Sequence, residues 1–481
     1  MVFSSSIFLF IFLPIVLLVY YVVPRKARNW VLLVASLLFY FWGEGRLVIL
    51  LVISSAINYC FGVWIFSLRE RASICKGVLA IGICMNLLLL GYYKYFDFAV
   101  ETINRFLNTD FQLPGIVLPI GISFFTFQGM SYIIDLYRKQ TDVQYNPFKI
   151  MLYISLFPQL VAGPIIRYSD VSLMIDKRET NSSIFAEGVR RFSIGLAKKV
   201  LIANSLAPIA DAVFNLPLSM HQPSTLWLGI ICFTLQLYFD FSGYSDMVIG
   251  IGLMFGFRFK ENFNFPYISK SIREFWRRWH ISLSSFFRDY LYIPLGGNIK
   301  GNMYFNLLIV FLATGLWHGA SFSFIVWGLW HGLFIVIENV IKRNCPKVLR
   351  FVRGHHPVIS AIRHLYTLFI VIIGLVIFRC SSISDGAHYV KSMLLWEYGT
   401  DVKLSTLYYL DGYHLTVLIC AIVFSVPVIP YLKKIYSERF TGIIAKNVMG
   451  TIQTVLPIVL LVLSALTVMN QGYNPFLYFR F

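Results

Sequence analysis

The sequence has few charged side chains. Asp, Glu, Lys and Arg make up 13% of its 481 residues, whereas a soluble domain usually carries about 25%. Hydrophobic residues make up 58% and aromatic residues 17%. This composition excludes a large soluble domain, because apolar runs cover nearly the whole chain. The sequence therefore predicts an all-α polytopic membrane protein.

Cysteine pairs and an N-terminal signal peptide are also missing. The seven cysteines include no C-x-x-C pair and lie mostly in apolar runs, which argues against metal ligands and disulfides. No basic residue precedes the first apolar run at 7–23, and no small-residue cleavage site follows it, so a secretory signal is excluded. Arg25, Lys26 and Arg28 come directly after that run. The positive-inside rule therefore places the N-terminus on the extracytoplasmic side.

Acidic residues are scarce relative to basic ones. The chain has 23 Asp and Glu against 41 Lys and Arg, a formal net charge of +18. In a membrane protein, such an excess is expected in cytoplasmic loops and against anionic lipid headgroups. We therefore expect membrane lipid as a partner and no nucleic acid.

The apolar runs predict about 11–13 transmembrane helices, together with interfacial or re-entrant helices. The segment 185–215 is only half apolar and is rich in basic residues, so we expect it to lie along the membrane interface. The candidate spans are 7–23, 29–43, 46–66, 77–96, 113–134, 148–166, 225–255, 304–320, 322–341, 360–379, 413–432 and 451–469.

The segment Ser271–Tyr290 has apolar residues at helical spacing and a polar face. We expect one cytoplasmic helix, on which nearby arginines lower the pKa of His280 and keep its imidazole neutral. Such a face can bind phosphates. The alternative is an interfacial helix whose basic face meets anionic lipid. The polar face consists of Arg273, Arg277, His280, Ser284 and Arg288.

The five-residue motif G-L-W-H-G occurs twice, at 315–319 and 328–332. His318 and His331 each lie within or beside an apolar span, where polar residues are costly and often functional. The flanking glycines allow close backbone approach. The alternatives are a structural histidine bonded to a neighbouring helix and a pair of haem ligands.

A third polar group lies within the candidate span 225–255. Two carboxylates at this depth are expected to face a cavity, a partner or the protein interior. A structural hydrogen-bond network would explain them equally well. The group consists of Gln236, Asp240, Ser242, Tyr244, Ser245 and Asp246.

These blocks resemble the membrane-bound O-acyltransferase superfamily, and most closely its bacterial branch that includes the membrane component of alginate O-acetylation. The motifs are long, their order is preserved, and the resemblance covers most of the chain. They are LQLYFDFSGYSD at 235–246, EFWRRWHISLS at 274–284, RDYLYIPLGG at 288–297 and LWHGA at 316–320, with MVFSS at 1–5 and PQLVAGPI at 158–165.

The resemblance implies a ring of transmembrane helices around a thin core in which funnels from the two sides meet. His318 matches the presumed catalytic histidine of that family, with Trp317 beside it, and His280 matches a second polar position. The chain would be a single membrane domain over 1–481. It would have N-terminal helices at 1–166, a catalytic core at 185–341 and C-terminal helices at 342–481.

The resemblance also implies an enzyme of the bacterial inner membrane that moves an acyl group from a cytoplasmic thioester. The expected acyl group is acetyl. The donor would be acetyl-CoA or an acyl carrier protein, with no bound cofactor and no metal. The acceptor would be an extracytoplasmic polysaccharide, reached directly or through an extracytoplasmic acyltransferase partner. The residues that would hold the donor are Arg273, Arg277, Arg278, Ser284 and Arg288.

Two other functions stay open. One is transfer of D-alanyl or another acyl group from a carrier protein to a cell-wall polymer. The other is transport of a polysaccharide or small molecule, which should show inverted repeats with paired broken helices. The sequence contains only the short G-L-W-H-G repeat, on adjacent spans.

Overall fold

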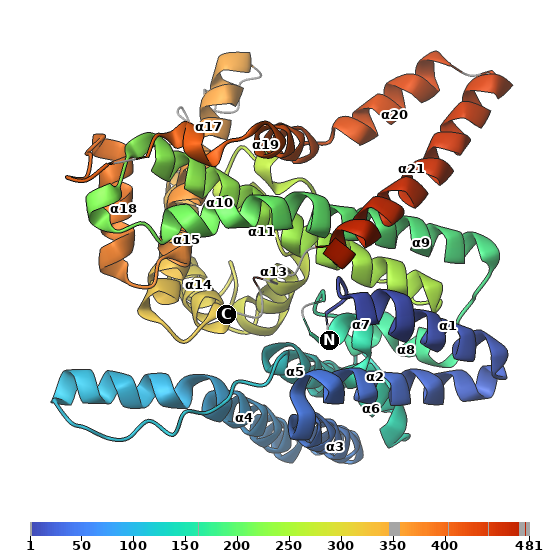
Figure 1. Ribbon diagram of the computed structural model, residues 1–481. Coiled ribbons are helices and arrows are strands. Elements are labelled where there is room, and N and C mark those ends of the chain that lie inside the picture. The colour runs from blue at the N-terminus through green and yellow to red at the C-terminus, as the bar shows by residue number, and fades with distance from the viewer. Residues whose placement is uncertain are drawn as a thin grey trace. The chain divides into compact units, whose positions relative to one another are not determined.

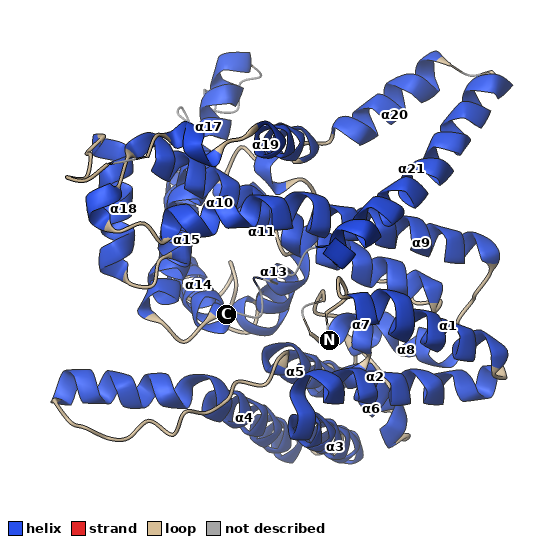
Figure 2. Ribbon diagram, in the orientation of Figure 1, coloured by secondary structure: helices blue, strands red, loops and turns tan. Residues whose placement is uncertain are grey.

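The computed structural model describes residues 2–481 except 162, 346–355, 403, 441, 471–476 and 478–481. Met1 and Ala162, which belong to the stretches that resemble the bacterial branch, lie outside the described residues. Across the described ranges every regular element is a helix and there is no strand (Figure 2). Helices satisfy their backbone hydrogen bonds internally, as a bilayer requires. The predicted all-α class is confirmed.

The contacts divide the chain into two units. The first contains Met1–Phe192 and Tyr244–Glu261, and the second contains Ser193–Gly243 and Asn262–Phe481. The helices α9 (Ser182–Ala197) and α11 (Pro223–Met254) each contribute residues to both units. The other helices of the first unit are η1 (Phe8–Phe12), α1 (Leu13–Val22), η2 (Arg25–Ala27), α2 (Arg28–Glu44), η3 (Gly45–Leu47), α3 (Val48–Ser67), α4 (Ala72–Leu107), α5 (Ile122–Tyr137), α6 (Pro147–Ser155), α7 (Phe157–Leu160) and α8 (Tyr168–Asp176).

The second unit contains both copies of the G-L-W-H-G motif. They lie on α14 and α15, which are neighbours in Figure 1. The helices of this unit are η4 (Lys198–Ala203), α10 (Asn204–Phe214), η5 (Leu218–Met220), η6 (Pro266–Ile268), α12 (Ile272–Arg278), α13 (Ile281–Phe287), η7 (Arg288–Tyr292), α14 (Met303–His318), α15 (Phe322–Asn344), α17 (Pro357–Arg379), α18 (Ile383–Leu395), η8 (Thr406–Tyr409), α19 (Gly412–Phe424), α20 (Val428–Arg439) and α21 (Ile443–Asn470).

Seven helices of the described chain are long and apolar enough to cross a membrane. An eighth is added if α19 and α20, which meet at a bend of 61°, form one span. Two further apolar helices, Phe8–Val22 and Met303–His318, are shorter. A chain with this many apolar helices is a multi-pass membrane protein.

Besides 413–432, which is divided between α19 and α20, two of the expected spans are not single helices. The segment 113–134 begins in an irregular loop, and its helix α5 starts only after Gly121, whose φ of 78° lies in the left-handed region. The segment 148–166 is divided into α6 and α7. Leu156, with φ −53° and ψ 111°, leaves the helical region between the two helices, and Pro158 lies in the first turn of α7, where a helix tolerates its missing N–H.

The segment 185–215 belongs to a longer helix. It is part of one helical run, Ser182–Phe214, that passes the same test of length and hydropathy as the other spans. Most of its apolar window is buried inside the protein. Two of its basic residues are paired inside the protein, Arg191 with Asp246 and Lys199 with Asp240, and its position relative to the membrane interface stays a prediction.

The helices α14 and α15 approach each other closely at two glycines. A Cβ atom added to Gly315 would lie 2.3 Å from the backbone oxygen of Phe324, and one added to Gly328 would lie 2.3 Å from that of Phe311. Neither position has room for a side chain. The two glycines are the first residues of the two G-L-W-H-G motifs, so the repeat sets how closely the helices pack.

We expect Gly328→Ala to destabilise the protein by about 1–3 kcal/mol, the usual cost of overpacking. The added methyl group would collide with the backbone of α14 and force the two helices apart. Thermal unfolding of the detergent-solubilised protein measures the effect. Gly77→Ala, on α4, is the matched control because its Cβ would meet no atom within 4 Å. Equal midpoints for the two variants would show that the close crossing is unimportant.

Candidate active site

The segment Ser271–Tyr290 is not one helix. It consists of α12, α13 and the π-helix η7, and the chain turns between α12 and α13 at His280. His280 has φ 45° and ψ 56°, a left-handed conformation that a helix interior does not allow. The predicted continuous helix is therefore wrong. The apolar residues before the break belong to one hydrophobic core, and Leu283, Phe286 and Phe287 after it are also buried, so burial continues through the break.

Asn262 holds this break in place. Its side-chain oxygen accepts hydrogen bonds from the backbone N–H of Ser282 at 3.0 Å and from the Ser282 hydroxyl at 2.9 Å, and it lies 3.3 Å from Nδ1 of His280. Its backbone oxygen accepts from the N–H of Ile281 at 3.0 Å. When Nδ1 of His280 donates to the amide oxygen, Nε2 remains as the acceptor nitrogen.

His280 is fully buried, and aromatic rings surround it. The ring of Phe241 lies at 4.7 Å and that of Trp317 at 5.7 Å, both edge to face. Burial lowers the pKa of His280 to about 3, so the imidazole is neutral at ordinary pH. The expected direction of the pKa shift is confirmed, but its cause is desolvation and not the neighbouring arginines.

We expect His280 to make the folded protein sensitive to acid. An unfolded histidine has a pKa of about 6.5, and the folded value is about 3. Between these values only the unfolded chain binds the proton, so stability falls as the pH drops below the unfolded pKa. His280→Asn, a residue that tolerates left-handed backbone, should show a shallower fall in thermal midpoint between about pH 7 and pH 4.5.

The control for this measurement is His388→Asn, because His388 is exposed on α18. Its midpoint should follow that of the unaltered protein at every pH. If His280→Asn also follows that curve, the burial of a neutral His280 does not contribute to the acid response.

His318 is the last residue of α14, and the chain leaves the helix at Gly319. The imidazole is buried among the rings of Trp317, Trp327 and Phe378, at centroid distances of 4.9, 4.8 and 5.5 Å. Trp317 therefore contacts both His318 and His280. The structure brings the two predicted catalytic histidines into contact with one indole ring.

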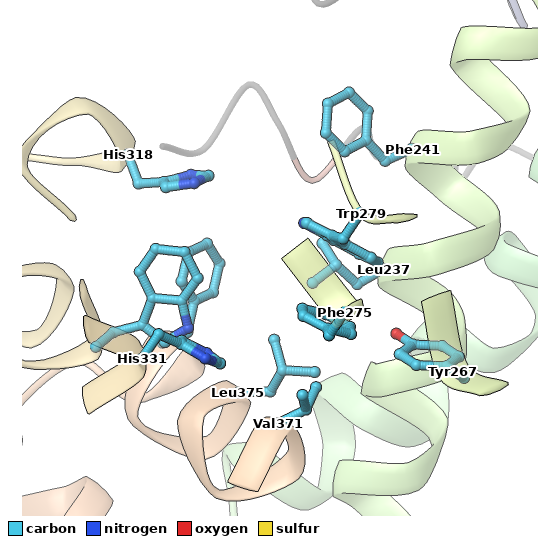
Figure 3. Close-up of a pocket in the computed structure, with 11 residues that line it drawn as sticks. Leu237, Phe241, Tyr267, Phe275, Trp279, His318, His331, Val371 and Leu375 are labelled. Carbon is cyan, nitrogen blue, oxygen red and sulfur yellow. The ribbon is translucent and has the colours of Figure 1, made fainter. Parts of the chain in front are cut away.

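His318 lines a narrow cavity within the second unit (Figure 3). The cavity has about 20 Å³ open to the centre of a water-sized sphere, room for about one water molecule. Figure 3 shows His318 and His331 pointing into this space from one side, while Phe275 and Trp279 face them from the other. The remaining wall is made by Leu237, Phe241, Tyr267, Trp327, Val371, Leu375 and Phe378.

The predicted donor-binding residues are not aligned with His280 on one helix face. Arg278 pairs with Glu274 at 3.0 Å, and Arg288 pairs with Asp289 at 2.6 Å. Arg273 donates to the side chain of Asn339 on α15. The Ser284 hydroxyl donates to the backbone oxygen of Trp276 at 3.1 Å. Arg277 and Arg288 are exposed.

Gln236 and Asp240 are buried on the part of α11 that belongs to the second unit. Asp240 forms an ion pair with Lys199 of η4 at 2.6 Å and accepts a hydrogen bond from the backbone N–H of Leu477 at 3.0 Å. Both charged side chains of the pair are almost completely buried. This pair gives Asp240 a structural role.

Tyr244 and Asp246 belong to the first unit. Tyr244 stacks on Phe3 at 4.8 Å, and Asp246 pairs with Arg191 at 2.6 Å. Arg191 also pairs with Glu261 at 2.5 Å. The polar group predicted on one span is thus divided between separate networks, each with its own basic partner.

We expect Lys199→Met to destabilise the protein by about 3–5 kcal/mol, because it leaves the buried Asp240 carboxylate without its ion-pair partner. Adding Asp240→Asn should recover much of that loss, since a neutral amide costs less to bury. Thermal unfolding of both single variants and the double variant measures the coupling. Additive losses would show that the pair does not act as a unit.

Several residues of the site were not singled out from the sequence. Lys199, Asn262, Trp327 and Phe378 all contact the predicted residues, but the helical spacing of the sequence does not show these contacts. His331 was noticed only as part of the repeat, and the structure places it on the wall of the His318 cavity. The repeated motif was the signal that could have identified it.

Comparisons with known proteins agree with this architecture. Residues 136–382 match the model of the membrane-bound O-acyltransferase family. The chain is 44% identical to the probable alginate O-acetylase AlgI of Pseudomonas aeruginosa over 409 residues, which is 83% of this chain and 76% of that protein. It is 34% identical to the peptidoglycan O-acetyltransferase of Helicobacter pylori, over 82% of this chain and 80% of that protein.

A more distant relative is the teichoic acid D-alanyltransferase of Bacillus subtilis. It is 30% identical over 219 residues, which is 43% of this chain and 55% of that protein. The chain belongs to the membrane-bound O-acyltransferase family, and it is a multi-pass membrane O-acyltransferase.

Proposed function

We propose that this protein moves an acetyl group from a cytoplasmic thioester across the bacterial inner membrane, for O-acetylation of an extracytoplasmic polysaccharide. The observation that carries the proposal is the buried imidazole of His318 on the wall of a narrow cavity. A buried histidine beside an apolar span is costly unless it has a function. The names of the most similar relatives, which act on alginate and peptidoglycan, support this substrate class.

His318 is proposed to act as the general base. Its imidazole takes the proton from the acceptor hydroxyl while the hydroxyl oxygen attacks the thioester carbonyl. The carbon–sulfur bond then breaks, and the thiolate leaves with the proton that the imidazole returns. A positioned base of this kind contributes about 10²–10⁴-fold to the rate.

His280 is proposed to support His318 through the ring of Trp317, by orienting the donor or by steadying developing charge. The neutral state of its imidazole supports this role, because a buried cation would be costly beside apolar rings. Its Nδ1 atom faces the side-chain oxygen of Asn262, which fixes the orientation of the ring.

The basic residues of the α12–η7 segment are proposed to hold the donor on the cytoplasmic side. Arg277 and Arg288 are exposed and therefore accessible to a phosphate-bearing donor such as acetyl-CoA or an acyl carrier protein. Arg273, Arg278 and Ser284, which are bonded within the protein, would shape this surface. Gln236 and Trp317 would complete the polar core between the two faces.

The acceptor side and the N-terminus are both proposed to face the extracytoplasmic side. The acetyl group would pass directly to the polysaccharide or to an extracytoplasmic acyltransferase partner. The alternative is transfer of D-alanyl from a carrier protein to a cell-wall polymer, and the match to the teichoic acid D-alanyltransferase keeps this second function in view.

We expect His318→Ala to lower acyl transfer by about 10²–10⁴-fold, and His280→Ala to lower it by less. The purified protein is given labelled acetyl-CoA or an acetyl carrier protein, and loss of the thioester and label on the acceptor are measured. D-alanyl carrier protein is tested in parallel, and its preferential use would favour the alternative.

His388→Ala is the control for loss of an unrelated histidine, because this residue is exposed on α18. It should keep the turnover of the unaltered protein. Near-normal turnover by His318→Ala would contradict the proposed base.

A further inference from the structure

His331 lines the same cavity as His318, and the proposed mechanism leaves it unused. Its side chain is almost completely buried. The rings of Trp276, Trp327 and Phe275 lie around it, at centroid distances of 5.4, 5.3 and 6.3 Å. Its Nδ1 atom has no hydrogen-bond partner among the residues that the structure describes. An unsatisfied buried nitrogen costs free energy, so its retention needs an explanation.

The position of the ring is fixed by its surroundings. On α17, a Cβ atom added to Gly374 would lie only 2.9 Å from Nε2 of His331, so this nitrogen packs directly against the backbone of the neighbouring helix. The adjacent Trp330 donates a hydrogen bond to the backbone oxygen of Ile370 at 2.9 Å and ties the same turn of α15 to α17. The imidazole is therefore held at the cavity wall by packing.

The rest of the cavity is apolar and small. Leu237, Val371 and Leu375 contribute aliphatic wall, and the phenol of Tyr267 already donates to the backbone oxygen of Thr234 at 2.7 Å. The open space of about 20 Å³ suits a group the size of one water molecule or one methyl group. A chain longer by even one methylene would have to displace side chains that are already packed.

We propose that this cavity is the acyl-group pocket of the enzyme, that it admits a two-carbon acyl group, and that His331 binds the acyl carbonyl. The inference rests on the proposed acetyl transfer and adds the pocket that selects the acyl group and the residue that binds its carbonyl. In its Nδ1–H tautomer His331 donates to the carbonyl oxygen, and the methyl group lies against Leu237, Val371 and Leu375. His318, on the same wall, faces the carbonyl carbon where the acceptor oxygen arrives.

The first experiment enlarges the pocket. Leu237→Ala is compared with Leu235→Ala, since both leucines lie on α11 with the same exposed fraction of 5% and only Leu237 lines the cavity. The transfer rate kcat/KM is measured with acetyl, propionyl and butyryl thioesters. The unaltered protein should prefer acetyl over propionyl by about 10–200-fold, the usual effect of one methylene in a tight pocket.

We expect Leu237→Ala to reduce that preference by at least tenfold, and Leu235→Ala to leave it unchanged even if it lowers stability. An unchanged preference in Leu237→Ala, or an equal change in the two variants, would overturn the proposed pocket. The acyl preference is a ratio of kcat/KM values measured on the same protein sample, so a partial loss of folded protein does not alter it.

The second experiment tests the contact from His331. His331→Phe keeps an aromatic ring and removes the unsatisfied nitrogen, so we expect a protein at least as stable as the original, with transfer lowered by at least tenfold for every donor. His331→Asn places an amide near the former Nδ1 position and should recover part of the activity. If His331→Phe transfers normally, or if Asn is no better than Phe, His331 does not bind the carbonyl.

Different results would contradict the proposed acyl transfer and the proposed acyl-group pocket. If the unaltered protein uses no acyl thioester, or if His318→Ala transfers normally, the proposed function itself fails. If the unaltered protein depends on His318 but its acyl preference does not respond to Leu237→Ala, only the pocket assignment is wrong.

Discussion

The close crossing of α14 and α15 is the constraint on which the candidate site depends. Gly315 and Gly328 remove the side chains that would keep the two backbones apart. His318 and His331 follow these glycines by three residues, so the same crossing brings both imidazoles to one cavity. In a membrane, where helices gain little from burying apolar surface against each other, such close packing is a main source of association.

The second constraint is the break at His280. A continuous helix would carry His280 among exposed arginines, as the apolar spacing predicted. The left-handed backbone at His280 and the hydrogen bonds that Asn262 accepts place the side chain in an aromatic environment beside Trp317. The arginines remain on the outer parts of α12 and η7. One backbone turn thus separates a neutral, buried histidine from the cationic surface that precedes and follows it.

Buried charges in this protein come with partners. Lys199 neutralises Asp240 in the second unit, and Arg191 neutralises Asp246 in the first. Ion pairs of this kind make it possible to keep carboxylates within apolar helices, although the pair adds little net stability. His331 differs from these residues, because its Nδ1 has no hydrogen-bond partner in the described part of the chain. That contrast is why a ligand contact is its best explanation.

The sequence by itself determined the all-helical membrane class, the family, and the importance of the two G-L-W-H-G motifs, because composition, motif order and glycine spacing are local properties. The tertiary structure decided which helices are broken, that Lys199 pairs with Asp240, and that His331 shares a cavity with His318. These features depend on contacts between residues far apart in the chain, and helical periodicity carries no information about them. His280 shows the difference most clearly: its spacing predicted an exposed helix face, and packing against Phe241 and Trp317 placed it in the core.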